Sequence, residues 1–376
     1  MPLELYIHIP FCVRKCAYCD FLSYAAGRDL QRAYVEALLQ EISSRGKREN
    51  VRGKSIVSIF FGGGTPSILP AEWICEILNA VREAFSLEAD AEITLEANPG
   101  TVDAEKLRMY RAAGINRLSF GCQSTLDEEL RMLGRIHSWS EFLESYSLAR
   151  EAGFTNINVD LMSGLPGQSA VSWEKSLRRI AELKPEHISA YSLILEEGTP
   201  MYEMQDQYVF PEEEEERFMY ERTREVLEEY GFSQYEISNY SLPGRECRHN
   251  LGYWTGTEYL GLGLGAASLL ENRRFSNTAD RDRYLEYCTE PEKLEEAEEI
   301  LTLEDRMGER MILGLRLIAG VSASEFEKDF GRSLTEQYGP VIQKYETWNL
   351  LAWEGDRLHL TREGISVSNQ VMAEFL

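Results

Sequence analysis

Short apolar runs alternate with amphipathic helical stretches through the first two thirds of the chain, and this alternation constrains the fold more than any other feature. The helical stretches include Leu30–Ser44, Ala71–Ala84 and Ala104–Ala113. Strands that alternate with helices form parallel sheets with right-handed crossovers. The sequence therefore predicts an α/β fold, as a full or partial barrel or as a doubly wound sheet. The predicted strands are Leu3–Ile9, Ser55–Phe61, Glu92–Glu96, Arg117–Phe120, Asn156–Leu161 and His187–Leu193.

Polar or glycine-rich residues directly follow five of these strands. In parallel α/β folds, ligand sites gather at the carboxyl ends of the strands. Turn glycines and helix caps would account for any one of these segments taken alone. Together they predict a site at this edge of the sheet. The segments are Phe11-Cys12, Gly62–Pro66, Glu96–Gly100, Gly121–Ser124, and Asp160 with Gly164–Gly167.

The chain is strongly acidic, with 39 Lys and Arg against 63 Asp and Glu and a formal net charge of -24. Such a surface repels phosphate backbones and anionic headgroups, so we expect no nucleic-acid partner. The first residues do not have the pattern of a signal peptide, and no apolar run reaches the roughly 18 residues of a membrane span. We therefore expect a cytoplasmic protein. Peripheral association with a membrane through a partner protein is compatible with this expectation.

The regular alternation ends near residue 210, and three parts are predicted. Residues 1–240 form the strand–helix core, 241–290 a smaller linking α+β segment, and 291–376 a C-terminal domain, with the charged stretch Glu290–Glu299 at the boundary. Three helices followed by a hairpin, Leu350–Trp353 and Arg357–Leu360, predict a winged-helix-like shape for the last part. Acidic residues outnumber basic ones there, which argues against DNA binding.

Three of the seven cysteines lie within eight residues, as Cys12-x-x-x-Cys16-x-x-Cys19. This clustering suits a metal site in a reducing compartment better than a disulfide framework. Three thiolates can bind three irons of a [4Fe–4S] cube and leave the fourth iron open to a non-protein ligand. The alternative is a zinc site, with His8 as a fourth ligand. His8 lies inside the first predicted strand, which favours a packing or supporting role instead.

The cysteine spacing after a first strand, with Tyr18 between the last two cysteines, resembles the signature of the radical SAM superfamily. Further motifs resemble the branch that contains oxygen-independent coproporphyrinogen III oxidase and the HemW-like haem chaperones. The resemblance covers nearly the whole chain and implies a partial (β/α)6 barrel for the core. The motifs are Tyr6–Cys12, Gly62–Pro66, Glu96-x-Asn98-Pro99, Gly121-x-Gln123, Arg135, and Asp160 with Gly164–Pro166.

The resemblance implies that Cys12, Cys16 and Cys19 hold a [4Fe–4S] cluster and that S-adenosylmethionine (SAM) completes its open iron. Glycines let backbone groups approach a ligand closely, carboxylates suit a cationic amine or ribose hydroxyls, and arginine suits a carboxylate. Whether these residues serve one SAM or two stays open. The implied SAM residues are Tyr6, Tyr18, Gly63, Gly64, Thr65, Glu96, Gln123, Arg135 and Asp160.

Two departures separate the chain from the oxidase. Phe21 stands where the oxidase has a further cysteine, and the chain begins almost at its first strand, where the oxidase has an N-terminal extension. Cys19-Asp20-Phe21 and His249-Asn250-x-x-Tyr253-Trp254 instead resemble the haem chaperones. The resemblance implies that haem is bound by His249, with Tyr253 and Trp254 packed on the macrocycle, and is passed to apo-haemoproteins of the respiratory chain by a homodimer.

Two alternatives remain at this point. Cys247, two residues before His249, is a second candidate for the axial haem ligand. The chain could also be an enzyme, a radical SAM oxidase that decarboxylates the propionates of coproporphyrinogen III. The sequence favours the chaperone because of Phe21 and the His249–Trp254 element.

Overall fold

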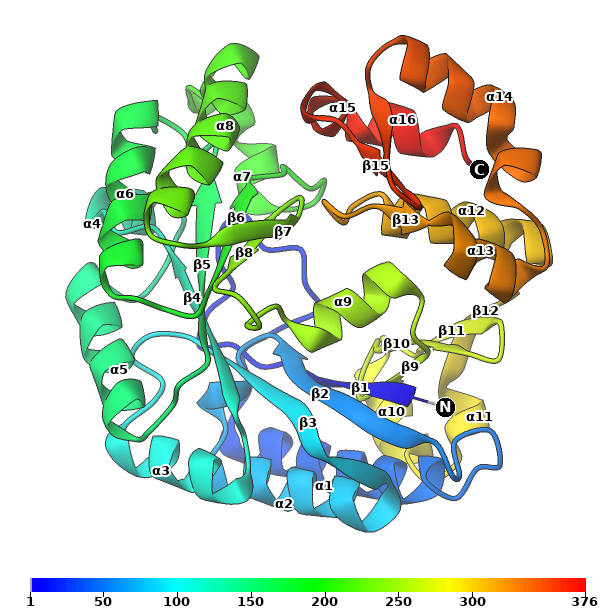
Figure 1. Cartoon of the computed structure of the whole chain (residues 1–376). Helices are drawn as coiled ribbons and strands as arrows, with labels where there is room; N and C mark the ends of the chain where they lie inside the picture. The colour runs from blue at the N-terminus through cyan, green and yellow to red at the C-terminus, as the bar shows by residue number, and fades with distance from the viewer. Residues whose placement is uncertain (1) are drawn as a thin grey trace.

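A single sheet of twelve strands runs through most of the molecule, and its centre consists of six parallel strands (Figure 1). The computed structural model describes residues 2–376. Each of the six predicted strands is present, and neighbours in chain order pair in parallel. The α/β prediction is thereby confirmed. The strands are β1 (Pro2–Ile9), β2 (Ser55–Gly63), β3 (Ser86–Ala97), β4 (Arg117–Gln123), β5 (Ile157–Ser163) and β6 (His187–Ser192).

The connecting helices form an arc around the outside of the curved sheet, which gives a partial barrel (Figure 1). Local chemistry explains their ends: the side chain of Asp103 accepts hydrogen bonds from two backbone N–H groups of α3, and Gly114, in the left-handed conformation, ends that helix. Every residue of β4 is buried, as expected for a strand covered on both faces. The helices are α1 (Arg28–Arg45), α2 (Ala71–Ala84), α3 (Ala104–Ala113), α4 (Asp127–Met132), α5 (Trp139–Glu151), α6 (Ala170–Glu182), α7 (Pro200–Glu203) and α8 (Glu213–Glu229).

Both sides of the six-stranded centre are extended by later segments. A hairpin of β7 (Ser233–Glu236) and β8 (Asn239–Ser241) pairs with β6, whereas β9 (Tyr259–Leu262) pairs in parallel with β1. The strands β10 (Ala267–Leu270) and β11 (Arg273–Asn277) continue from β9 in antiparallel order. Residues 241–290 therefore add strands to the main sheet. The same segment contains α9 (Arg248–Thr255) inside the curve of the sheet and α10 (Arg281–Tyr287) (Figure 1).

The charged stretch Glu290–Glu299 is regular structure, formed by α11 (Pro291–Leu294) and the edge strand β12 (Glu295–Ile300). Arginines offset the repulsion between its acidic side chains. Glu295 is nearly buried and pairs with Arg45 and Arg273, and Glu299 pairs with Arg274 at 3.2 Å. A row of charges at a sheet edge also discourages pairing with another chain. The stretch thus completes the sheet, and the division at residues 240 and 290 stays a prediction.

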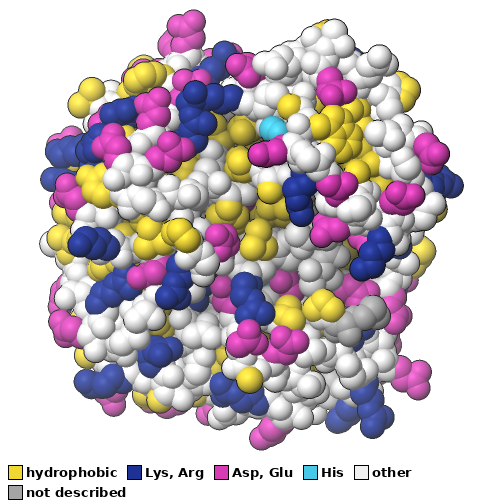
Figure 2. All heavy atoms as spheres, viewed as in Figure 1, with side chains coloured by type: hydrophobic (Ala, Val, Ile, Leu, Met, Phe, Trp, Pro, Cys, Tyr) yellow, Lys and Arg dark blue, Asp and Glu magenta, His cyan; other side chains and the backbone are white. Residues whose placement is uncertain are grey.

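The C-terminal part has a three-stranded antiparallel sheet and a hydrophobic core of its own. Three helices precede the hairpin, which agrees with the winged-helix-like prediction. On the face shown in Figure 2, hydrophobic side chains gather in a hollow between this part and the barrel. The elements are α12 (Leu303–Gly314), β13 (Val321–Ser322), α13 (Ala323–Phe330), α14 (Leu334–Thr347), β14 (Leu351–Glu354), β15 (Arg357–Leu360), α15 (Arg362–Ser366) and α16 (Ser368–Ala373).

Among residues 2–376, no helix combines the length and apolar character that crossing a membrane requires.

Candidate functional site

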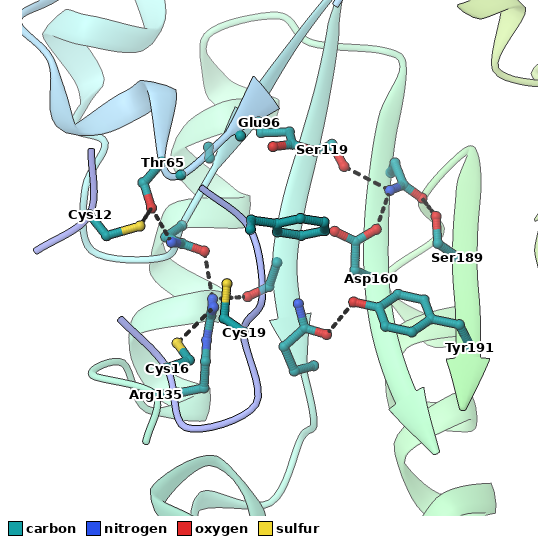
Figure 3. Close-up of a pocket in the computed structure, with 18 of the residues that line it drawn as sticks. Cys12, Cys16, Cys19, Thr65, Glu96, Ser119, Arg135, Asp160, Ser189 and Tyr191 are labelled. Carbon is teal, nitrogen blue, oxygen red and sulfur yellow. Dashed lines mark hydrogen bonds between the residues drawn. The ribbon is translucent and has the colours of Figure 1, made fainter. Parts of the chain in front are cut away.

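A cavity of about 370 Å³ lies at the carboxyl ends of the parallel strands (Figure 3). It brings together residues from the parallel strands β2–β6 and from the loop after β1, because the carboxyl ends of parallel strands meet at one edge of a sheet. In Figure 3 the three cysteines lie on one side and Asp160, Ser189 and Tyr191 on the other. The predicted residues that line this cavity are Cys12, Cys16, Tyr18, Cys19, Gly63, Gly64, Thr65, Glu96, Gln123, Arg135 and Asp160.

The cysteine loop is held to the barrel by backbone hydrogen bonds. Cys12 N–H donates to the Tyr24 carbonyl at 3.1 Å, and Ala17 N–H donates to the Leu133 carbonyl at 3.1 Å. All three loop cysteines are free thiols, partly exposed to the cavity. The fixed loop thus presents three soft sulfur donors to one cavity.

The donor set fits a [4Fe–4S] cube better than zinc. In the cube each thiolate binds a different iron, so the sulfur atoms stand apart, whereas a zinc site gathers its ligands around one point. Within the part of the chain that the structure describes, no three His, Cys, Asp or Glu side chains converge on a single-ion position. Thr65 Oγ1 lies 3.5 Å from Cys12 Sγ, and Arg135 Nη1 donates to Cys16 Sγ at 3.7 Å. Such contacts are typical of groups that support cluster sulfurs.

The His8 side chain supports the segment that follows the cysteines by a hydrogen bond to its backbone. Its Nε2 donates to the Leu22 carbonyl at 2.8 Å, so Nδ1 accepts from the Tyr6 hydroxyl at 3.1 Å. Burial lowers the pKa of His8, which keeps this ring neutral. Tyr6, predicted as a SAM residue, is therefore placed behind the cavity and is not part of its lining.

Two buried carboxyl groups, Glu96 and Asp160, line the cavity. Complete burial, together with the charge of Asp160, raises the pKa of Glu96 to about 8. Burial also raises the pKa of Asp160, which accepts a hydrogen bond from Asn158 Nδ2 at 2.7 Å. A cationic ligand would relieve the cost of ionising these groups in a site shielded from water. The ammonium and sulfonium groups of SAM are ligands of this kind.

The glycines at the end of β2, Gly63 and Gly64, have a packing role that the sequence did not predict. A Cβ on Gly64 would lie 2.6 Å from the Phe11 carbonyl oxygen, and one on Gly63 would lie 2.5 Å from the His8 ring. Gly63 also has a φ of 109°, which side chains other than glycine rarely adopt. These glycines therefore let β2 lie directly against the start of the cysteine loop.

A polar network that was not predicted from the sequence lies on the inner face of β4–β6. Asn158 is the centre of this network. Its Nδ2 donates to Ser119 Oγ at 2.8 Å and also to Asp160, and its Oδ1 accepts from His187 Nδ1 at 2.6 Å. The Tyr191 hydroxyl donates to Gln123 Oε1 at 2.9 Å (Figure 3). The alternation of polar and apolar residues in His187–Ser192 was the available signal, because alternate strand residues face the same side.

The His249–Trp254 element forms α9 and lies between two cavities. Asn250 lines the first cavity, whereas Tyr253 and Trp254 line a second cavity of about 360 Å³. His249 lines neither. Its ring stacks on Phe60 with centroids 5.2 Å apart and is almost completely buried.

Both ring nitrogens of His249 have partners inside the protein. Nδ1 lies 2.8 Å from Ser58 Oγ, and Nε2 lies 3.2 Å from the Tyr253 hydroxyl. Burial lowers the pKa of His249 to about 3, so the imidazole is neutral and chemically able to bind a metal. Of the three predicted haem residues, the structure thus brings only Tyr253 and Trp254 to a common cavity.

Cys247 is less suited to bind haem iron. Its side chain is fully buried and its Sγ lies 3.4 Å from a carboxylate oxygen of Glu92. Burial raises the pKa of its thiol to about 12, so the thiolate that a metal needs is disfavoured.

The barrel and the cysteine loop are those of a radical SAM protein: the radical SAM superfamily pattern matches residues 6–180, and that of the HemN C-terminal domain matches residues 301–367. The heme chaperone HemW of Lactococcus lactis is 35% identical over 377 residues, which cover 100% of this chain and 97% of that protein. The heme chaperone HemW of Bacillus subtilis is 36% identical over 99% of this chain and 98% of its own length. The chain belongs to the HemW family.

A solved structure resembles the whole chain. Coproporphyrinogen III oxidase (HemN) from Escherichia coli, described as a radical SAM enzyme, superimposes with a TM-score of 0.86 at 25% identity, over 100% of this chain and 90% of that one. The chaperone family and the oxidase therefore share one architecture, and individual residues must distinguish them.

Proposed function

We propose that this protein is a haem chaperone, which binds haem and delivers it to apo-haemoproteins. The observation that carries this proposal is the similarity to proteins named heme chaperone HemW along the full length, 35% identity over 97% of the Lactococcus lactis protein. Haem acceptors of the respiratory chain, a homodimeric state and a cytoplasmic location belong to the same proposal.

In this proposal, Cys12, Cys16 and Cys19 hold a [4Fe–4S] cluster and SAM completes the open iron. When bound, the cluster and SAM supply redox chemistry next to the barrel. Glu96 and Asp160 attract the cationic groups of SAM, and Arg135 fixes the cysteine side of the cavity. Arg135 donates to Asn98 Oδ1 at 2.6 Å and to the Gly121 carbonyl, so its position does not depend on a ligand.

Phe21 supports the chaperone over the oxidase. Its ring is 70% exposed and lines the first cavity next to Cys19, at the position where the resemblance to the oxidase calls for a further cysteine. A phenyl ring supplies neither a thiolate nor a proton. The shared architecture leaves the oxidase as the second candidate.

For haem itself we propose the second cavity, with Tyr253 and Trp254 against the macrocycle. His249 lies directly behind Tyr253, so rotation of the Tyr253 side chain would open the path from His249 Nε2 to the iron. Imidazole is a common axial ligand of haem iron.

Haem transfer tests the proposal. Protein loaded with haem is mixed with an apo-haemoprotein, and the acceptor is separated and its Soret band recorded. We expect haem to move to the acceptor from the loaded protein. In parallel, the reconstituted protein is incubated with coproporphyrinogen III, SAM and a reductant under anaerobic conditions. Conversion to protoporphyrinogen without haem transfer would establish the oxidase instead.

A further inference from the structure

The second cavity lies where the C-terminal domain meets the main sheet, between α9, the strands β9–β11 and the helices α12 and α13. Helix α12 packs directly against α9. The volume of the cavity, about 360 Å³, falls within the range of small-molecule sites, about 300–1,000 Å³. The walls are mainly aromatic and aliphatic: Tyr253, Trp254, Tyr259, Leu269, Leu301, Leu313 and Phe330.

Three arginines and three acidic residues also line this cavity, but most of their charges are already paired. Arg274 donates to Glu309 at 2.6 Å, and Glu258 pairs with Lys54 outside the cavity. Asp329 is exposed at the rim. Arg306 and Arg310 come from α12 and lie on one face of it because they are four residues apart.

Both of these arginines have donor capacity to spare. Arg310 keeps only 11% of its side chain exposed, donates from Nη1 to the Thr255 carbonyl at 2.6 Å and forms an ion pair with the exposed Glu325 at 3.5 Å. Its Nε is buried with no hydrogen-bond partner among residues 2–376. Arg306 lies 5.4 Å from the ring centroid of Phe330 and forms no ion pair within the described chain.

A second residue that lines the cavity also has an unsatisfied donor. The indole Nε1 of Trp254 is buried and has no acceptor in the described residues. Buried N–H groups without a partner are rare, since leaving one unpaired is costly. Two residues of this wall thus carry N–H groups that are unpaired among the described residues, and together with Arg306, which has no ion pair there, they favour a ligand that brings acceptor oxygens.

We propose that this cavity binds the propionate edge of haem, with Arg306 and Arg310 taking the carboxylates and Tyr253, Trp254 and Phe330 packing on the macrocycle. This inference rests on the proposed haem chaperone function and adds the C-terminal domain to the haem site. Arginine binds carboxylates with paired, charge-assisted hydrogen bonds. Such specific contacts are needed because a surface with a net charge of -24 offers a dianion little general attraction.

The test compares haem with haem dimethyl ester, in which both propionates are blocked. Affinities are measured by Soret titration of the full chain, for the wild type and for Arg306→Ala and Arg310→Gln. We expect the wild type to bind haem at least about tenfold more tightly than the ester, the size of one charge-assisted contact. Each variant should lose about tenfold in haem affinity and bind the ester as the wild type does.

Arg332→Ala is the matched control, because Arg332 is an exposed arginine of the same domain that pairs with Glu304 outside the cavity. It should leave both affinities unchanged. Arg306 makes no hydrogen bond that the fold needs, and an unchanged unfolding midpoint of Arg306→Ala verifies this. If the wild type binds haem and Arg306→Ala binds it equally well, or the ester binds as tightly as haem, the inference is wrong and the chaperone proposal stands. A wild type that binds no haem overturns both.

Discussion

Tyr253 stands between His249 and the second cavity, with its hydroxyl 3.2 Å from His249 Nε2. The two side chains are one turn apart on α9 and meet edge to face, with ring centroids 5.1 Å apart. The residues of the His249–Trp254 motif therefore do not all line the second cavity. Tyr253 is accessible to a ligand in the cavity, whereas His249 is buried behind Tyr253.

Replacement of His249 should change the coordination of bound haem. We expect His249→Ala to shift the Soret maximum and to weaken haem binding by about tenfold or more, because the iron loses its imidazole ligand. Tyr253→Phe removes only the hydroxyl that contacts His249 Nε2, so it should retain the imidazole-type spectrum. Absorption and electron paramagnetic resonance spectra measure both effects. An unchanged spectrum in His249→Ala would exclude His249 as ligand.

Replacement of any loop cysteine should abolish the cluster. Anaerobically reconstituted wild type should contain about four irons per chain, whereas Cys12→Ala, Cys16→Ala and Cys19→Ala should lose the cluster absorption. Iron and sulfide analysis gives the readout. Cys75→Ala serves as control, since Cys75 lies on α2 outside the cavity. Zinc in place of iron in the wild type would contradict the assignment.

Glu96 should make the stability of the SAM-free protein depend on pH. Its pKa is raised from 4.5 to about 8 by burial and by Asp160, so between these values the folded state holds a proton that the unfolded state has released. The free energy of unfolding therefore falls as the pH rises through this window. Glu4 contributes in the same direction, because burial raises its pKa to about 8 as well.

The measurement is a series of urea denaturations from about pH 5 to about pH 8. We expect the free energy of unfolding of Glu96→Gln to fall less with rising pH than that of the wild type, because a neutral amide cannot release a proton. The contribution of Glu4 remains. Parallel profiles for the wild type and the variant would show that Glu96 titrates in its ordinary range.

A side chain at Gly64 should disturb the cysteine loop. The Cβ of Gly64→Ala would meet the Phe11 backbone at 2.6 Å, and neither backbone can yield without moving Cys12. We expect a loss of about 1–3 kcal/mol in stability and reduced iron incorporation. Gly27→Ala is the control, because no atom lies within 4 Å of its new Cβ and its φ of -73° suits alanine. Full iron loading of Gly64→Ala would show that the loop adapts.

Much of the barrel could be predicted because its signals are local. The apolar run at Leu3–Ile9 and the helical pattern at Ala71–Ala84 depend only on the nearest residues, and both elements form as expected. The strand Glu295–Ile300 was not predicted, because it has no local signal of this kind. Its charges are compatible with a strand only because Arg45 and Arg273 come from distant segments.

The order of strands and helices, the grouping of Cys12, Cys16 and Cys19, and the family resemblance could be predicted because all of these depend on spacing along the chain. The direction in which each polar side chain faces depends instead on the folded arrangement of distant segments. The partners of His249 and Arg310 illustrate this: Ser58 lies 191 positions from His249, and Thr255 lies 55 positions from Arg310. Burial and hydrogen bonding between such distant groups arise only when the sheet closes around α9 and the C-terminal domain covers it.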